Sequence, residues 1–301
     1  MRIYRALFVR EVLISITLAA LFASQYREAM ANESTITEDH AIAHFERIGG
    51  LFSVTPRKQV VSLFLSEAQL SDADLGHLAP LKDLTELTLM DCKATDAIWQ
   101  HIAGLSSLEK LALWGTQITD DGLKHLRHFP KLRCLDIRAT RIGNNGLSHI
   151  AKLRDLETLE LLGTRVTSKG LASITQLSGL QKLGLVQTKV DDSGLEAIGQ
   201  LKKLTELSLE ETSITDAGLK HLSGLTRLKL LTIHNTAVTE NGLKHLEGLS
   251  ELETLYLCVP VSKIGLRSLK KMNALRDLYI GDGEPDLREG LSNELPGVGV
   301  Y

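Results

Sequence analysis

The stretch LEKLALWGTQITDDGLKHLRHF, residues Leu108–Phe129, decides the fold because the rest of the chain repeats it. Leucine stands at positions 1, 4, 6, 16 and 19 of this unit, threonine at 9, isoleucine at 11 and glycine at 15. The first position recurs in steps of 24 residues without a slip, at Leu84, Leu108, Leu132, Leu156, Leu180, Leu204, Leu228 and Leu252. A fixed period of this length predicts an array of stacked repeats.

Each unit carries a strand signal followed by a helix signal. The LxLxx segment has period two, so positions 4 and 6 point to one face and positions 3, 5 and 7 point to the other. After a turn, Thr119 and Asp120 offer an N-cap and negative charge in the first turn, and Leu123, Leu126 and Phe129 follow at spacing three. One unit cannot fold alone, because about seven aliphatic side chains at roughly 2 kcal/mol each do not offset its backbone entropy.

Stacking the units should curve the array. Parallel strands lie about 4.8 Å apart, whereas packed helices need about 10 Å, so we expect the strands on the inner side. The consensus LxxLxLxxTxITDxGLxxLxxL resembles the leucine-rich repeat over residues 60–280, as about nine full repeats and a partial tenth. This resemblance implies an α/β leucine-rich-repeat solenoid, a horseshoe with a parallel concave sheet and short convex helices. The ITDxGL turn is similar to the repeats of exported bacterial proteins, especially planctomycete-type arrays.

Helical caps are expected at both ends of the array. Thr35 and Glu38 have the spacing of a capping box, and apolar residues follow them at one-turn intervals, which predicts a helix up to Gly50. The next residues, 51–54, alternate as a short strand would. Residues 32–59 are therefore interpreted as the amino-terminal cap.

The carboxyl-terminal end departs from the pattern. The ninth repeat, LETLYLCVPVSKIGL, is one residue short and, counted from Leu252, places Pro260 at position 9. A local change of curvature is expected there. Residues 275–280 should form a tenth strand, and residues 281–301 contain leucines at helical spacing up to Pro296. These residues are interpreted as the carboxyl-terminal cap.

Residues 1–31 have the order of a secretory signal. Three arginines precede an apolar run at residues 12–23, and Ala29 and Ala31 are small residues at a cleavage site. The run is shorter than the roughly 20 apolar residues that span a bilayer comfortably. The sequence therefore predicts an exported protein, periplasmic or extracellular. The alternative is a protein anchored to the membrane by an uncleaved amino-terminal segment.

Composition and charge limit the partners. Hydrophobic residues make up 43% of the chain and charged residues 24%, which is typical of a globular protein. The net charge is -3, and the remainder after residue 31 has 30 basic against 35 acidic residues, or -5. An acidic surface argues against binding to a nucleic acid.

The sequence contains no motif that favours catalysis, a metal or a cofactor. GxxxxGK, HExxH, GxSxG and CxxC strings do not occur in it, and we therefore expect a protein that is not an enzyme. Six histidines share position 18 of their repeats, on the convex helices. Helices about 10 Å apart hold these rings too far from one another to share a zinc ion, so they are interpreted as surface residues. They are His77, His101, His125, His149, His221 and His245.

Position 9 should form a ladder of buried hydroxyl groups that bind turn backbone. Its threonines are Thr116, Thr140, Thr164, Thr188, Thr212 and Thr236, and Cys92 takes the same position in the second repeat. Cys134 and Cys258 are five repeats apart, about 24 Å at strand spacing, which is too far for a disulfide.

Function is expected at the outward strand positions, which vary. Position 7 runs Ser66, Met90, Trp114, Arg138, Leu162, Val186, Glu210, His234 and Cys258; position 5 runs Phe64, Thr88, Ala112, Asp136, Glu160, Gly184, Ser208, Thr232 and Tyr256, followed by Tyr279. Large apolar side chains facing water on a concave sheet suggest a partner surface. The predicted ligand-binding residues are Met90, Trp114, Asp136, Arg138, Glu160, Leu162, Val186, His234, Tyr256 and Tyr279.

Two partners fit such a surface. We expect a protein or peptide partner centred on Trp114 and Arg138, since tryptophan and arginine are favoured interface anchors. The alternative is an envelope scaffold or adhesin that binds surface polysaccharide through the aromatic side chains, with Asp136 and Glu160 as hydrogen-bonding groups. Neutral variation at these positions, or packing of the side chains against each other, would explain the same pattern without a partner.

Overall fold

The computed structural model describes residues 36–301 apart from 58, 67–69, 71, 73 and 281–284. The predicted signal segment at residues 1–31 therefore lies outside the described residues. The chain divides into two compact units. Unit 1 contains the described residues up to Ile118 together with His128–Leu132, and unit 2 contains Thr119–Arg127 and Arg133–Tyr301. Within the described part, no helix is long and apolar enough to cross a membrane.

Unit 1 begins with the predicted amino-terminal cap. Its elements are helix α2 (Ile36–Arg47), strands β1 (Leu51–Val54) and β2 (Val60–Ser66), 3-10 helix η1 (Asp74–Leu78), strand β3 (Glu86–Met90), helix α3 (Ile98–Ile102) and strand β4 (Lys110–Ala112). Strand β1 pairs antiparallel with β2, whereas β2, β3 and β4 pair in parallel. The predicted helix and short strand are thus confirmed, and Phe45 of α2 is fully buried.

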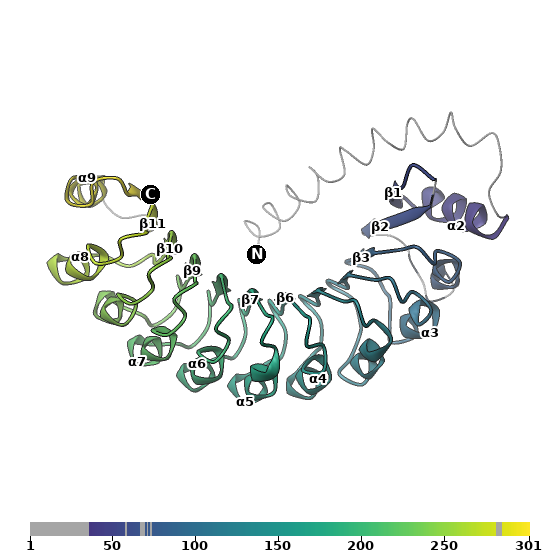
Figure 1. Ribbon diagram of the computed structural model, residues 1–301, viewed down its shortest axis with the longest axis horizontal. Helices are drawn as coiled ribbons and strands as arrows, with labels where there is room; N and C mark the ends of the chain where they lie inside the picture. Colours follow the sequence, from purple (N-terminus) through teal and green to yellow (C-terminus); the bar gives the residue numbers. More distant parts are fainter. Residues whose placement is uncertain (1–35, 58, 67–69, 71, 73, 281–284) are drawn as a thin grey trace. The chain divides into compact units, whose positions relative to one another are not determined.

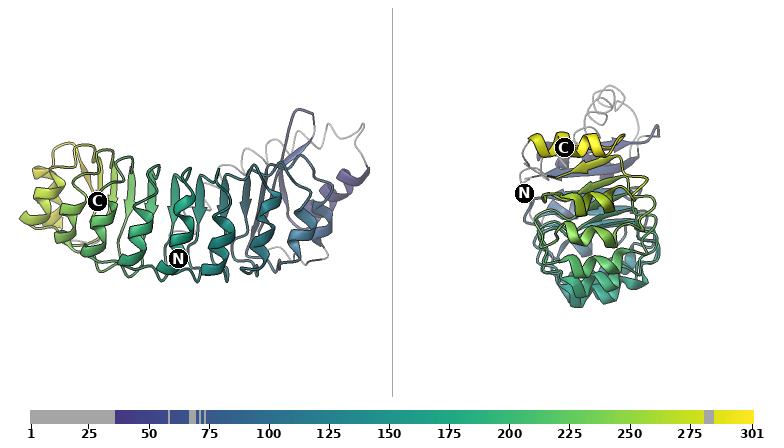
Figure 2. Two further views of the ribbon diagram at one scale, coloured as in Figure 1. Left: turned by 60° about the horizontal axis from the view of Figure 1, so that its bottom comes forward. Right: turned by 90° about the vertical axis from the view of Figure 1, so that its left-hand side faces the viewer.

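Unit 2 repeats a three-residue strand, a turn and a short helix (Figures 1 and 2). Its strands are β5 (Cys134–Asp136), β6 (Thr158–Glu160), β7 (Lys182–Gly184), β8 (Glu206–Ser208), β9 (Leu230–Thr232), β10 (Thr254–Tyr256), β11 (Asp277–Tyr279) and β12 (Gly299–Val300). The helical segments are η2 (Gly122–His128, whose last residue lies in unit 1), α4 (Asn144–Ile150), α5 (Ser168–Leu171), η3 (Ala172–Gln176), α6 (Asp192–Ile198), α7 (Asp216–Leu219), η4 (Lys220–Leu222), η5 (Glu240–His245), α8 (Lys263–Leu269) and α9 (Pro285–Glu294).

Within unit 2 the strands line the inner side of a curve and the helices lie side by side on its outer side (Figure 1). Strands β5 to β12 follow one another in chain order, and they pair in parallel. Because the step is 24 residues from β5 to β10, leucines face leucines in register there, as in Leu159↔Leu183 and Leu183↔Leu207. These leucines are 0–2% exposed, so they form one continuous core between the sheet and the helices.

The threonine ladder is confirmed. Each of the six position-9 hydroxyl groups donates to the backbone carbonyl three residues before it, at 2.6–2.7 Å. These bonds satisfy a carbonyl at the bend where the strand ends, which is costly to bury without a partner. Cys92, at the same position, is buried as expected, and its burial raises the pKa of the thiol.

Position 8 adopts the left-handed backbone region, and this conformation corrects the alignment of the ninth repeat. Asn235 and Glu211 have φ of 54° at position 8, and Cys258 has φ of 53° although it was counted as position 7. The missing residue therefore falls before Cys258. Val259, not Pro260, takes the ladder position, and Ser262 takes the N-cap position of α8, where its side chain accepts from the Ile264 amide.

A second ladder, here called the clamp, joins neighbouring repeats of unit 2 at positions 13 and 12. A side chain at position 13 accepts from the backbone amide at position 12 of the next repeat, at 2.6–2.9 Å. Asp192, for example, accepts from the Thr215 amide at 2.7 Å and from its hydroxyl at 2.6 Å. The acceptors are Asp120, Asn144, Ser168, Asp192, Asp216 and Glu240.

The clamp explains the glycine of the ITDxGL motif. A Cβ added at Gly218 would lie 2.3 Å from Oδ1 of Asp192, and one at Gly242 would lie 2.5 Å from Oδ1 of Asp216. Both glycines are buried. The sequence predicted Asp120 and its equivalents as first-turn charges, whereas the structure shows that they bind the following repeat. Glycine at position 15, three residues after the position-12 group, leaves room for the carboxylate of the preceding repeat.

The carboxyl-terminal cap contains the expected helix, α9; Leu291 within it and Leu295 directly after it are buried. Beyond Pro296 the chain adds β12, which the sequence did not indicate, parallel to β11. The predicted boundaries between the caps and the repeats, at residues 59/60 and 280/281, stay predictions. The division into two compact units falls within the repeats and does not test these boundaries.

Candidate functional site

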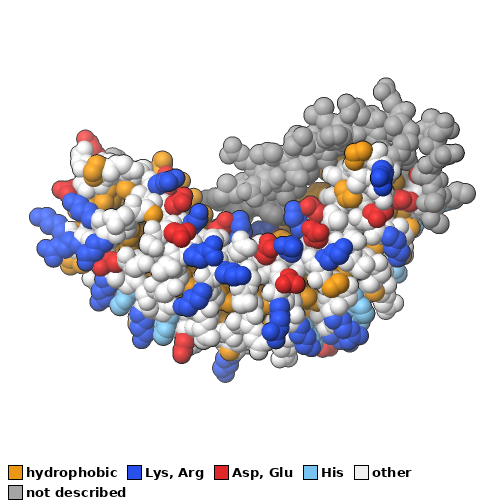
Figure 3. Space-filling model, viewed as in Figure 1, with side chains coloured by type: hydrophobic (Ala, Val, Ile, Leu, Met, Phe, Trp, Pro, Cys, Tyr) orange, Lys and Arg blue, Asp and Glu red, His pale blue; other side chains and the backbone are white. Residues whose placement is uncertain are grey.

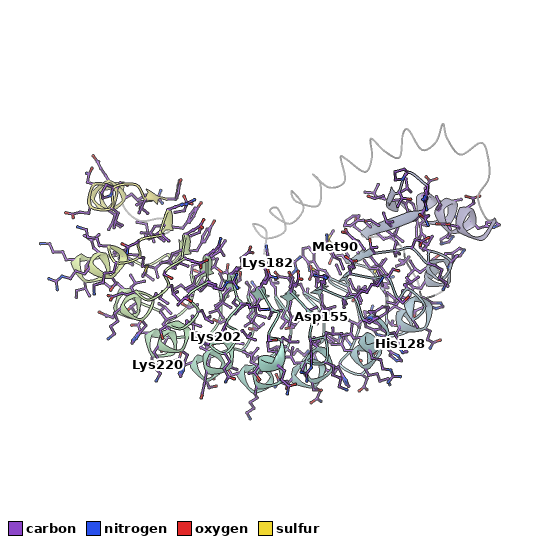
Figure 4. All side chains as sticks on the ribbon, viewed as in Figure 1. Met90, His128, Asp155, Lys182, Lys202 and Lys220 are labelled. Carbon is purple, nitrogen blue, oxygen red and sulfur yellow. The ribbon has the colours of Figure 1, made fainter. Side chains whose placement is uncertain are left out.

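The sequence predicted that four apolar side chains of the outward rows face water. This prediction is wrong, because all four are buried. In unit 1, Met90 is 8% exposed and Trp114 is 9% exposed. In unit 2, Leu162 is 8% exposed and Val186 only 3%. Figure 4 labels Met90, which lies on the strand side of unit 1. All four side chains are at most 9% exposed, so they do not present open apolar surface to a partner.

Strand spacing gives the physical reason. Neighbours in one row are only about 4.8 Å apart, so a large side chain covers the next one rather than extending into solvent. The left-handed residue at position 8 then turns the chain directly after position 7. Packing of these side chains against their surroundings was the alternative explanation of the pattern, and the low exposure favours it.

Asp136 and Arg138 form a bidentate ion pair on the outward face of β5 in unit 2. The Nε of Arg138 donates to Oδ1 and Oδ2 of Asp136 at 2.9 and 3.0 Å, and NH2 donates to Oδ2 at 2.5 Å. Both side chains are buried. Burial lowers the pKa of the Arg138 guanidinium, but the hydrogen bonds and charge of Asp136 outweigh this effect and raise the pKa. The predicted anchor at Arg138 is therefore already committed to Asp136.

Glu160 lies on the neighbouring strand, β6, beside the Arg138 pair. Its carboxylate occupies the space that Gly184 leaves in the next strand, since a Cβ on Gly184 would lie within about 2 Å of a carboxylate oxygen. Burial raises the pKa of Glu160 to about 7; Arg138 lowers it, and the charges of Asp136, Glu206 and Glu210 raise it. The outward face of unit 2 therefore has more negative charge than Arg138 neutralises.

A third group on this face was not singled out from the sequence. Glu210 is only 1% exposed and Thr232 is 6% exposed, and His234 is half-buried. The hydroxyl of Thr232 and Nδ1 of His234 are buried and have no hydrogen-bond partner among the described residues. All three positions belong to the outward rows, but a carboxylate and a threonine give no apolar signal, and so only His234 was predicted.

Tyrosines continue the outward face toward the carboxyl end. Tyr256 and Tyr279 stack with ring centroids 3.9 Å apart and an interplanar angle of 4°. Tyr301 stacks on Tyr279 at 4.8 Å and 21°. Burial raises the pKa of Tyr256 to about 12, and its hydrogen bond to Tyr279 adds to this effect. Tyr256 and Tyr279 were predicted; Tyr301, which directly follows β12, was missed because that strand was not expected.

Charged residues flank the inner strands of unit 2 in pairs one repeat apart. Lys182 contacts Glu206 at 2.6 Å, and Arg133 contacts Glu157 at 2.6 Å. Acidic and basic side chains are accordingly interspersed on the side of unit 2 that Figure 3 shows. Figure 4 labels Lys182 on the strand side and Lys220 on the helix side. These pairs are largely exposed, so they contribute little to stability.

Among the described residues, no group of three or more His, Cys, Asp or Glu side chains could hold a metal ion. The six position-18 histidines are half-buried on the helices. In unit 1 the structure adds a contact that the sequence did not predict: His77 stacks on His44 at 3.8 Å, and His44 Nε2 lies 2.9 Å from Asp74. This arrangement fastens α2 to η1.

The family comparison agrees with the repeat architecture. A family model described as "Leucine-rich repeat region" matches residues 119–296, more than half of the chain. The crystal structure of an internalin from Listeria monocytogenes str. 4b F2365 is similar at 18% identity and a TM-score of 0.47, over 87% of this chain and 94% of that chain. A search of the curated proteins found no match. From the extent of the family match, the chain belongs to the leucine-rich repeat family.

Proposed function

We propose that this chain is a non-enzymatic binding module whose outward strand face in unit 2 binds an extended segment of a protein partner. The observation that carries the proposal is the stacked row Tyr256, Tyr279 and Tyr301. Tyr256 and Tyr279 are half-buried and Tyr301 is exposed, so part of each ring is accessible. The row lies on the outward face of strands whose inward face already supplies the core.

The chemistry of the row suits a peptide. Rigid tyrosine rings lose little conformational entropy on binding, and tyrosine is enriched at the centres of protein interfaces. The rings repeat at strand spacing, and they are followed toward β8 by His234, Thr232 and Glu210. An extended peptide that crosses the strands would therefore meet aromatic surface first and polar, acidic groups next. We therefore propose that the binding surface is centred on the tyrosine row, and not on Trp114 and Arg138 as the sequence predicted.

Selection from a peptide library displayed on phage tests the proposal. We expect enriched peptides to bind the folded chain and to bind Tyr256→Ala/Tyr279→Ala at least 10-fold more weakly, because two of the three rings are lost. Lys220→Ala, on the helix side, is the matched control and should change the affinity less than twofold. Equal binding to the tyrosine variant would refute this placement. Glycan-array binding without peptide enrichment would favour the polysaccharide alternative.

Export of the protein, of the bacterial type that the repeats resemble, is part of the proposal. It is supported by the order of arginines, apolar residues and small residues within 1–31. Mass spectrometry of the chain recovered from the periplasm or medium should find an amino terminus at Asn32. A chain that keeps residues 1–31 and stays with the membrane fraction would favour the anchored alternative.

A further inference from the structure

Two buried polar atoms on the outward face of unit 2 lack partners among the described residues. They are the hydroxyl of Thr232 and Nδ1 of His234. Thr232 is more than nine-tenths buried. A buried polar group without a hydrogen bond is costly, and native chains retain few of them. Two side chains two residues apart, Thr232 and His234, therefore each have a buried atom without a hydrogen bond. This arrangement points to a ligand group that supplies the missing bonds.

Strand register places both atoms beside a carboxylate and an aromatic ring. Thr232 pairs with Ser208 on one side and with Tyr256 on the other. The Glu211 amide donates to the carbonyl of His234, which puts Glu210 next to His234 across the same pair of repeats. The His234 and Tyr256 rings lie 6.4 Å apart. Glu210, Thr232, His234 and Tyr256 thus form one group, here called the Glu210 cluster.

Charge at this place favours a cation. Glu210 is almost completely buried, and its charge acts on both Glu160 and Tyr256, whose pKa values it raises. It therefore lies between the acidic end and the aromatic end of the face. A carboxylate, a hydroxyl and a neutral imidazole nitrogen can all accept hydrogen bonds, and the face of a tyrosine ring attracts a cation.

We propose that the Glu210 cluster binds the guanidinium group of an arginine side chain in the partner, an inference that rests on the proposed peptide-binding function. Arginine fits better than lysine because its planar group carries five donors spread over a fork. Two donors reach the Glu210 carboxylate, the hydroxyl of Thr232 and Nδ1 of His234 accept others, and the plane stacks against Tyr256. This arrangement recognises one side chain, whereas the tyrosine row binds the neighbouring peptide.

Saturation-transfer NMR with two small probes tests the inference. N-acetyl-arginine methylamide carries the guanidinium, and N-acetyl-citrulline methylamide has nearly the same shape without the charge. We expect the arginine probe to bind at least 10-fold more tightly than the citrulline probe. Glu210→Gln should remove this preference, because it removes the charge and keeps the size of the side chain. Equal binding of both probes, or no binding of the arginine probe, would overturn the inference.

The adjacent residue provides the control. Glu211 is exposed and accepts from the side chain of Gln187 at 2.8 Å, so Glu211→Gln removes the same charge one residue away. It should leave the arginine preference within twofold, and a loss as large as that of Glu210→Gln would contradict the assignment. If Glu210→Gln does not fold, Thr232→Val tests the inference instead. Binding of the arginine probe at least threefold weaker than to the native chain supports the inference, and unchanged binding refutes it. Peptides that bind the tyrosine row without arginine preference would leave the proposed function standing and this inference refuted.

Discussion

The clamp and the outward strand rows of unit 2 belong to the same repeats but differ in how completely their polar groups are satisfied. In the clamp, Asp192 and Asp216 each bind both the amide and the hydroxyl of a threonine in the next repeat. In the rows, Thr232 and His234 keep buried atoms without a partner in the described chain. The repeat therefore stabilises itself at its turns and leaves part of its strand face unsatisfied.

This difference predicts that substitutions in the two regions have different effects, on stability in one and on the proposed binding in the other. The clamp recurs in six successive repeats, and each of its acceptor side chains carries an oxygen that binds the backbone amide of the next repeat. The outward rows hold a buried ion pair, a carboxylate with a pKa near 7 and stacked tyrosines within seven strands. Substitutions in the clamp should affect mainly the free energy of unfolding, and substitutions in the tyrosine row and the Glu210 cluster should affect mainly binding.

The largest effect is expected from Asp192→Ala. It removes two charge-assisted hydrogen bonds to Thr215 and leaves the Thr215 amide without its acceptor. We expect the free energy of unfolding to fall by about 3 kcal/mol, measured by urea denaturation. Glu196→Ala, at an exposed position of the same helix, is the control and should cost less than about 0.5 kcal/mol. Equal effects of the two substitutions would show that the clamp does not hold the repeats together.

Glu160→Gln tests the strand rows through pH. The pKa of Glu160 is raised to about 7, so between about pH 4.5 and 7 the unfolded chain releases a proton that the folded chain keeps. Stability contributed by this group is complete below pH 4.5 and is lost as the pH rises through 7. We expect Glu160→Gln to be more stable than the native chain by about 2 kcal/mol at pH 8 and similar at pH 4. Parallel pH profiles of melting temperature would contradict the raised pKa.

Gly218→Ala tests the space that the clamp needs. The added Cβ would meet Asp192 Oδ1 at 2.3 Å, so the carboxylate must move and its bonds to Thr215 must lengthen. We expect a loss of about 1–2 kcal/mol, reduced by the better helix propensity of alanine. The same substitution in an Asp192→Ala background should cost less, and the difference measures the contact. If Gly218→Ala lowers the free energy of unfolding equally in both backgrounds, the effect comes from contact with Leu195, which lies 2.9 Å from the added atom.

The smallest effect is expected from Lys182→Met. Lys182, labelled in Figure 4, is the first residue of β7 and pairs with Glu206 of β8; the two side chains are 47% and 40% exposed. The free energy of unfolding should change by less than about 0.5 kcal/mol, and the difference should disappear in 1 M salt. A larger change in the free energy of unfolding that persists in 1 M salt would show that ion pairs such as Lys182–Glu206 stabilise the sheet.

Several parts of this molecule could be predicted from the sequence because they depend on periodicity. The 24-residue step predicted the parallel register, the buried leucines and the threonine ladder. The capping box and amphipathic pattern of residues 35–50 predicted the cap helix, which the structure places at Ile36–Arg47. The clamp was missed for a different reason. Asp120 and Asp192 lie at a helix start, where local reasoning assigns an acidic residue to its own helix, whereas their partners belong to the next repeat.

The candidate site was predicted only as a set of positions. The sequence determined that positions 5 and 7 leave the core and which residues occupy them, since this follows from strand alternation. Tertiary structure alone decided that Leu162 and Val186 are buried and that Glu160 fills the space beside Gly184. It also decided that the Thr232 hydroxyl and His234 Nδ1 lack hydrogen-bond partners among the described residues. Exposure, pKa and hydrogen bonding depend on atoms from neighbouring strands, and a repeat read by itself does not contain them.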